Sequence, residues 1–318
     1  MLVQMLWGCD PARQLERAWL HQLIGSALVD EYPWWLREHR PPQWMTQLFP
    51  VLVESGILRL EKSPSKDRLR RQAEDRQRRL LILREQGPFA VVHLSDEEGF
   101  DALNWYGLVP DGTPIWRNFF HTRLQTLHSR LHCYPIGPRD LFLARSLDPK
   151  VLVRASQRTF PWAFMGTLWP SGSRRLAVSL FLRTLPHGMY YGGKNFGQGL
   201  PLEEYRANLL NSVFALAPEG DRHLDTFRLW ESLCCGTIPL LVNHFDMADY
   251  LLGANHPIPV FKSWPDALCF AQQQLDDQIR LDMLQANIFD WWLKKQAFIN
   301  KSFADSLSNA QVAWYSET

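Results

Sequence analysis

Short apolar runs alternate along this chain with amphipathic stretches of helix length, and this alternation restricts the fold more than any other feature of the sequence. Such alternation is typical of βαβ units, in which successive strands pair in parallel and the helices cover the sheet. With 318 residues, the chain is long enough for two such domains. We expect α/β domains at residues 1–152 and 153–278, followed by a C-terminal helix and tail at residues 279–318.

The expected elements follow from the apolar runs and from the residues that cap helices. In the first half, the pattern predicts strands at Leu2–Trp7, Phe89–Leu94 and Thr113–Trp116, and helices at Pro11–Val29 and Lys66–Glu85. In the second half, it predicts strands at Thr159–Leu168, Val213–Pro218, Ile238–Asn243 and Ile258–Phe261, and helices at Ser173–Leu185, Pro201–Ser212, Asp225–Cys235, from Pro265 onward, and at Ile279–Ile299. The stretch Trp34–Pro64 is left unassigned, and the glycine-rich stretch Gly188–Gly199 is expected to be a loop.

The composition excludes several classes of protein. Hydrophobic residues make up 46% of the chain, which is enough apolar surface to offset the entropy lost on folding and argues against a disordered chain. A net charge of +1 argues against a nucleic-acid binder, which needs an excess of cations. No apolar run is long enough to span a bilayer, and the N-terminus lacks the basic segment of a signal peptide. The five cysteines include no C-x-x-C pair, so we expect neither a zinc site nor a disulfide framework, and a cytoplasmic protein.

The most informative segment is 211–242, NSVFALAPEGDRHLDTFRLWESLCCGTIPLLV. A buried parallel strand is expected to end at Pro218, which places Glu219 and Gly220 at the carboxyl edge of the sheet, where open α/β sheets bind ligands. The next helix begins near Asp225 or Thr226, and its free N–H groups and positive dipole end can hold an anion such as a diphosphate.

Two charged side chains follow within this helix. Arg228 in the first turn can make a bidentate phosphate contact. Glu231 lies one turn further on the same face, where a carboxylate can accept both hydroxyls of a ribose. An alternative stays open at this point: the charged side chains can instead form a structural ion-pair cluster of Glu219, Arg228 and Glu231.

The run from Val213 to Leu241 resembles the donor-binding segment of exostosin-type glycosyltransferases and of the related ribitol xylosyltransferases. The matching pieces are residues 218–220 (PEG), 226–233 (TFRLWESL) and 236–240 (GTIPL). Ser232 stands where the family usually has Ala, and Glu219 stands where it often has Arg, which leaves the donor sugar open. A weaker likeness covers residues 93–97, 116–118 and 164–166, so the resemblance extends from Phe89 to Phe261.

This resemblance implies a GT-B architecture, with two Rossmann-like α/β domains facing across a cleft and a C-terminal helix that packs back on the first domain. The first domain would serve the acceptor, and the second would bind a nucleotide sugar, with UDP the expected nucleotide. Gly166, Gly220 and Thr226 would line the donor site. Arg174 and Arg175 would clamp the diphosphate with Arg228, although either could instead be a solvated surface residue.

The family likeness also suggests how sugar transfer would proceed. An inverting transfer needs one general base to take the proton of the acceptor hydroxyl, and positive charge on the departing diphosphate. Asp96, just after an apolar strand, is the first candidate for the base and Glu97 the second; Asp96 could also be a simple turn residue. The chain has no Asp-x-Asp metal-binding pair, so we expect no metal and no cofactor, with arginines and a helix N-terminus neutralising the leaving group.

Other patterns lead to weaker alternatives. Residues 188–195 nearly match a P-loop, but Asn195 replaces the Ser or Thr that holds magnesium and no helix is predicted to follow. The basic helix Lys66–Glu85 is compatible with peripheral contact to an anionic membrane, although its interleaved acids favour a solvated face. The resemblance thus implies an inverting glycosyltransferase that acts on a glycan or a lipid-linked acceptor. The alternative is a non-catalytic protein of the same fold that binds nucleotide sugars or glycans.

Overall fold

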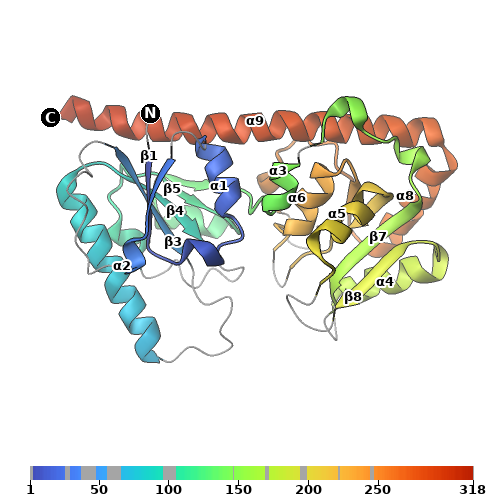
Figure 1. Ribbon diagram of the computed structural model, residues 1–318, viewed down its shortest axis with the longest axis horizontal. Helices are drawn as coiled ribbons and strands as arrows, with labels where there is room; N and C mark the ends of the chain where they lie inside the picture. Colours follow the sequence, from blue (N-terminus) through green and yellow to red (C-terminus); the bar gives the residue numbers. More distant parts are fainter. Residues whose placement is uncertain are drawn as a thin grey trace. The chain divides into compact units, whose positions relative to one another are not determined.

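Two parallel sheets, one in each half of the chain, organise the computed structural model (Figure 1). It describes residues 3–25, 29–36, 48–55, 66–95, 105–145, 147–168, 172–193, 199–220, 223–243 and 247–317. By their internal contacts, Met1–Pro135 and Ala297–Thr318 form one unit and Ile136–Gln296 the other. The boundary expected near residue 152 lies within the second of these units.

The first unit has a six-stranded sheet of order β2-β1-β3-β4-β5-β6 in which every neighbouring pair is parallel. Its strands are β1 (Val3–Trp7), β2 (Val29–Tyr32), β3 (Phe49–Ser55), β4 (Ala90–Leu94), β5 (Ile115–Arg117) and β6 (Leu131–Cys133). Its helices are α1 (Arg17–Ile24) and α2 (Lys66–Gln86), with short 3₁₀ turns that include Tyr106–Leu108 and Thr122–Leu127.

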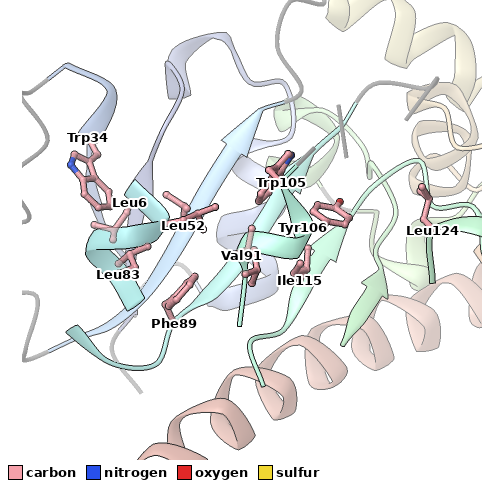
Figure 2. Packing of buried hydrophobic residues seen from close by; sticks show 12 residues of the cluster. Leu6, Trp34, Leu52, Leu83, Phe89, Val91, Trp105, Tyr106, Ile115 and Leu124 are labelled. Atoms are coloured by element: carbon pink, nitrogen blue, oxygen red, sulfur yellow. The ribbon is translucent and has the colours of Figure 1, made fainter. Parts of the chain in front are cut away.

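A hydrophobic cluster holds α2 and the strands of the first unit together (Figure 2). Leu80 and Leu83 of α2 lie three residues apart, so they share one helix face, and that face is buried. They pack with apolar side chains from β1, β3, β4 and β5; the cluster is Leu6, Trp34, Leu52, Leu80, Leu83, Phe89, Val91, Trp105, Tyr106, Val109, Ile115 and Leu124. The amphipathic pattern expected of this helix is therefore confirmed.

The second unit has a five-stranded parallel sheet of order β11-β10-β9-β7-β8. Its strands are β7 (Phe160–Thr167), β8 (Met189–Gly193), β9 (Ser212–Leu216), β10 (Ile238–Val242) and β11 (Val260–Phe261). Its helices are α3 (Asp140–Ala144), α4 (Ser173–Thr184), α5 (Leu202–Leu210), α6 (Phe227–Cys234), α7 (Ala248–Leu252) and α8 (Trp264–Asp276). The strand–helix alternation predicted for this half is confirmed from β7 to α8.

Three expectations about single elements are wrong. The helix expected at Pro11–Val29 is shorter, because α1 ends at Ile24, where Gly25 follows with a positive φ of 93°, and Val29 begins β2. The loop expected at Gly188–Gly199 contains the edge strand β8. The last helix, α9 (Gln278–Glu317), extends well beyond Ile299.

Helix α9 contributes to both units. Near its middle, Trp292 packs on Trp230 of α6 with ring centroids 5.4 Å apart. Towards its end, Phe303 packs on Trp116 of β5 at 4.8 Å, and Ser306 accepts a hydrogen bond from the Trp116 indole at 3.3 Å. The expected return of the C-terminal helix to the first domain is thus confirmed. Among the described residues, no helix has both the length and the apolar character that crossing a membrane requires.

Candidate functional site

The sheet of the second unit changes its winding direction between β7 and β9. The chain goes from β7 to β8 on one side, returns across β7 to β9, and then continues outward to β10 and β11. The paired residues of β7 and β9 end at Ala163 and Ala215, while β7 continues to Thr167. The carboxyl ends of β7 and β9 therefore form a topological switch point, the position at which open parallel sheets bind ligands.

Helix α6 begins at this switch point. Thr226 is its N-cap residue, with extended backbone angles, but its side chain makes no capping hydrogen bond. The Thr226 hydroxyl is buried and has no hydrogen-bond partner within the described part of the chain. Because the N–H groups of a first helical turn lack intrahelical partners, the turn and this hydroxyl together can donate to an anion.

Asp225, the residue before the N-cap, fixes the start of α6 through hydrogen bonds to a distant segment and to the helix itself. Its buried carboxylate accepts the Ile136 N–H at 3.1 and 3.0 Å and the Trp230 indole N–H at 2.7 Å. The sequence placed Asp225 near the helix start but could not assign it this role, because Ile136 is 89 residues away along the chain.

Arg228 lies in the first turn of α6 and reaches back to the end of β7. Its guanidinium carbon lies 4.5 Å from the centre of the Phe164 ring, and Nη2 donates to the Met165 carbonyl at 3.4 Å. Its Nε is buried without a hydrogen-bond partner among the described residues. Burial lowers the pKa of the Arg228 guanidinium, so the charged form would gain from a nearby anion.

Gly166 provides the space for this guanidinium. A Cβ built on Gly166 would fall on Nη2 of Arg228, so a side chain at this position would displace it. The structure thus brings together Gly166 and Arg228, two of the residues predicted for a donor site.

Arg174 links the two strand ends from the other side of the switch point. Its Nε donates to the Glu219 carbonyl at 3.2 Å and its Nη1 to the Thr167 carbonyl at 3.3 Å. Gly220 then closes the turn by donating its N–H to the His223 carbonyl at 2.8 Å. Arg174, Glu219 and Gly220 therefore lie beside the end of β7, whereas the neighbouring Arg175 is exposed.

Glu231, one turn beyond Arg228 on α6, lies close enough to affect the pKa of Arg228 but is already paired. Its side chain is 1% exposed and forms a two-point ion pair with Arg139, with Nε–Oε1 at 2.5 Å and Nη2–Oε2 at 3.1 Å. Burial lowers the pKa of Arg139, but the Glu231 carboxylate more than offsets this and keeps that pKa above its ordinary value. Burial, together with Glu231, raises the pKa of the nearby Tyr205. Nothing in the local sequence pointed to Arg139, which lies 92 residues from its partner.

Asp96 and Glu97, the candidate bases, lie outside the described residues. The residue before them, Ser95, is fixed by its N–H, which donates to the Asn118 side chain at 2.6 Å. Asn118 in turn donates to Glu16 at 3.4 Å. The chain therefore leaves β4 from a defined position at the carboxyl edge of the first unit's sheet.

The same edge carries buried charges that the sequence did not reveal. Glu54 at the end of β3 accepts a hydrogen bond from Arg79 of α2 at 2.7 Å and lies 3.5 Å from Arg76. His93 contacts the Tyr106 hydroxyl at 2.7 Å, and Arg117 donates to that hydroxyl at 3.1 Å. Within the ranges described, no three His, Cys, Asp or Glu side chains come together in an arrangement that could hold a metal ion.

Comparisons with known proteins identify the fold. No family model matches the chain. No curated protein matches it either. Among solved structures, β-glucosyltransferase, described as a DNA-modifying enzyme and studied with uridine diphosphoglucose, aligns with a TM-score of 0.55 at 12% identity over 98% of this chain and 99% of that chain. The T4 phage protein BGT in complex with UDP and Mn²⁺ aligns at 0.53 and 12% identity over 96% and 99%.

A third structure, the N-terminal domain of trehalose-6-phosphate phosphatase from Candida albicans, aligns at 0.55 and 11% identity over 96% of both chains. The chain has a GT-B fold. At these identities the alignments establish the fold alone. In this fold, the switch point of the second unit carries the residues that the sequence predicted for a donor site, apart from Glu231, which is paired with Arg139, and Arg175, which is exposed.

Proposed function

We propose that this protein is a glycosyltransferase of the exostosin type that binds a nucleoside diphosphate sugar, with UDP as the nucleotide, at the carboxyl ends of β7 and β9. The observation that carries the proposal is the pair of buried, unsatisfied donors at the start of α6, the Thr226 hydroxyl and Nε of Arg228. A buried cation is costly unless it meets an anion, so a diphosphate is the ligand that best satisfies this site. The GT-B fold and the presence of UDP or uridine diphosphoglucose in two studies of a β-glucosyltransferase of similar fold support this assignment.

The proposed transfer is a single displacement with inversion at the anomeric carbon. The hydroxyl oxygen of a glycan or lipid-linked acceptor forms the new glycosidic bond, Asp96 or Glu97 takes the hydroxyl proton, and the nucleoside diphosphate leaves with the bonding electrons. Arg228, Thr226 and the free N–H groups of α6 would stabilise the charge that develops on the departing diphosphate. Arg174, from the first turn of α4, would hold the loop at Glu219 and Gly220 against the end of β7.

Glu231 and Arg175 have less direct roles in the proposed donor site. For Glu231 to accept ribose hydroxyls, its carboxylate must share its oxygens with Arg139. Substituting Glu231→Gln would then weaken UDP binding more than binding of inorganic pyrophosphate, and equal losses would show that Glu231 serves only the ion pair. Arg175 is exposed on α4, and its contact with a diphosphate stays a prediction.

Calorimetric titration of the full chain with UDP tests the donor site. Arg228→Ala should weaken UDP binding by about 1.5–3 kcal/mol, because a charge-assisted hydrogen bond to the diphosphate is lost. Arg183→Ala, an exposed arginine near the end of α4, should leave affinity unchanged and is the matched control. Equal affinity of wild type and Arg228→Ala would contradict the phosphate role of Arg228.

Turnover then separates an enzyme from a binding protein. Wild-type protein should release UDP from a UDP-sugar in the presence of acceptor, without loss of rate when EDTA is added, and NMR of the product should show inverted anomeric configuration. Asp96→Asn or Glu97→Gln should abolish release while donor binding persists. Binding without any turnover in wild type would favour a non-catalytic nucleotide-sugar protein.

A further inference from the structure

Edge strand β8 presents two tyrosines to solvent in a unit whose other large aromatic side chains are mostly buried. Tyr190 and Tyr191 are 37% and 36% exposed. Since successive side chains of a strand point to opposite faces, these neighbours lie on opposite sides of the sheet. Tyr190 pairs in register with Phe164 of β7, which is fully buried. The two strands thus place an exposed aromatic ring beside a buried one.

Phe164 connects Tyr190 to the anion site. The Tyr190 ring is stacked on Phe164, with centroids 6.5 Å apart and planes inclined by 26°. The Arg228 guanidinium also packs over Phe164, with its carbon 4.5 Å from the ring centre. One buried ring therefore contacts both the cation proposed to bind a diphosphate and an exposed aromatic side chain.

Paired glycines make room for both groups at the same edge of the sheet. Gly166 and Gly192 are register partners near the carboxyl ends of β7 and β8. A Cβ on Gly166 would fall on the Arg228 guanidinium, and a Cβ on Gly192 would fall on the Tyr190 hydroxyl. The phenol ring thus runs along its strand towards the carboxyl edge, which is where the anion site lies.

We infer that Tyr190 forms the stacking platform for the nucleobase of the donor, in line with the diphosphate site at Arg228. A nucleoside diphosphate has a charged group at one end and a flat aromatic ring at the other, which matches a buried cation and an exposed phenol joined through Phe164. The inference deepens the proposed function and rests on it. Because every base has a π-face, stacking of this kind supplies affinity without choosing the base. Base choice must therefore come from other contacts.

Titration of the full chain with UDP, GDP and inorganic pyrophosphate tests this platform. Tyr190→Ala should weaken both nucleotides about tenfold and leave pyrophosphate unchanged, because only the nucleotides carry a ring to stack. Tyr190→Phe keeps the ring and should bind all three as wild type does. Tyr191→Ala, equally exposed on the opposite face, is the matched control and should also bind as wild type.

The possible results separate this inference from the proposal beneath it. If UDP binds and Arg228→Ala weakens it while Tyr190→Ala does not, the platform is wrong and the donor site stands. Equal weakening of pyrophosphate, or an equal effect of Tyr191→Ala, would show that Tyr190 only supports the strand and would overturn the inference. A loss for a UDP-sugar without a loss for UDP would place the sugar on Tyr190 and also overturn it. If wild-type protein binds neither UDP nor pyrophosphate, both proposals fail together.

Discussion

Gly166 shows how one missing side chain can decide the geometry of a binding site. The guanidinium of Arg228 occupies the space in which a Cβ at this position would lie. The atom that would be struck is the far end of a flexible side chain, so the fold can accommodate the change by moving Arg228. The cost should then appear in ligand binding rather than in stability.

We therefore predict that Gly166→Ala weakens UDP binding at least tenfold while it changes the free energy of unfolding by less than about 1 kcal/mol. Calorimetry and urea unfolding measure the two quantities on the same protein. Gly199→Ala is the control, since a Cβ at Gly199 meets nothing within 4 Å. A large loss of stability with normal affinity would mean that Gly166 serves packing and not the placement of Arg228.

At the residue scale, positions within one helix could be predicted from the sequence, but contacts between distant segments could not. The start of α6 near Thr226 was predicted correctly, and it places Arg228 in the first turn and Glu231 three residues later on the same face. The partner of Glu231 could not be predicted, because Arg139 comes from a distant segment and no local pattern encodes such a pair. An ion pair of this kind depends on how the chain packs, which is known only once the fold is.

Helix α2 illustrates the same limit for a whole element. Its sequence predicted a basic, solvated face, and Arg70, Arg71 and Arg78 are indeed exposed. Arg76 and Arg79 are instead buried, because Glu54 at the end of β3 provides a carboxylate for both. Hydrophobic periodicity cannot distinguish an arginine on the solvent face from one that reaches a buried acid.

This buried cluster should make the first unit sensitive to acid. Burial alone would raise the pKa of Glu54, but Arg79 and Arg76 outweigh it, so the pKa of Glu54 is lowered. The stabilisation is complete above the ordinary glutamate pKa of about 4.3 and is lost as the pH falls through the lower value of the folded protein. Glu54→Gln should cost about 3 kcal/mol at pH 7, since it leaves two buried arginines without a carboxylate, and should remove this part of the acid dependence.

Urea unfolding at pH 7, 5, 4 and 3 checks this prediction in wild type and variant. Glu74→Gln is the matched control on the same helix, because Glu74 is 56% exposed and its ion pair with Arg70 has a spacing of 3.8 Å. A surface pair of this kind should contribute less than about 0.5 kcal/mol. Parallel pH curves for wild type and Glu54→Gln would show that the Glu54 cluster does not govern acid stability.

Strand β8 was not predicted from the sequence, which favoured a loop at these residues. Its glycines favoured a loop, because glycine weakens an isolated strand. In the folded chain, β7 supplies a partner for five successive residues, Met189–Gly193, and this pairing prevails over the local preference. Gly192 of β8 is needed there, because a Cβ at this position would fall on the Tyr190 hydroxyl.

For the whole molecule, the alternation of strands and helices was sufficient to predict two parallel sheets, because each βαβ unit is a local feature of the chain. The predicted strands became β1, β4, β5, β7, β9, β10 and β11. Besides β8, the strands that were missed are β2, β3 and the three-residue β6, which lie where local signals are weak. β2 is partly exposed and carries Asp30 and Glu31. β3 has a proline as its second residue and lies within the stretch that was left unassigned.

The length of α9 was also underestimated, and its extra turns carry the contacts to the first unit. Phe303 is fully buried against Trp116, and Leu307 is 1% exposed one turn later. These positions repeat at a spacing of four residues, which places them on one face of the helix. The C-terminal part of α9 is therefore a piece of the first unit's core, supplied from the far end of the chain.

We predict from this that Phe303→Ala destabilises the first unit by about 3–5 kcal/mol, the usual cost of removing a buried phenylalanine ring. Hydrogen exchange of β5 and β10 reports on the two units separately in the full chain, and protection should fall in β5 and persist in β10. Phe298→Ala, on the same helix but 64% exposed, should change stability by less than about 0.5 kcal/mol. Equal loss of protection in β5 and β10 would mean that α9 couples the stability of the two units. In that case, unfolding of the first unit would also unfold the second unit and with it the proposed donor site.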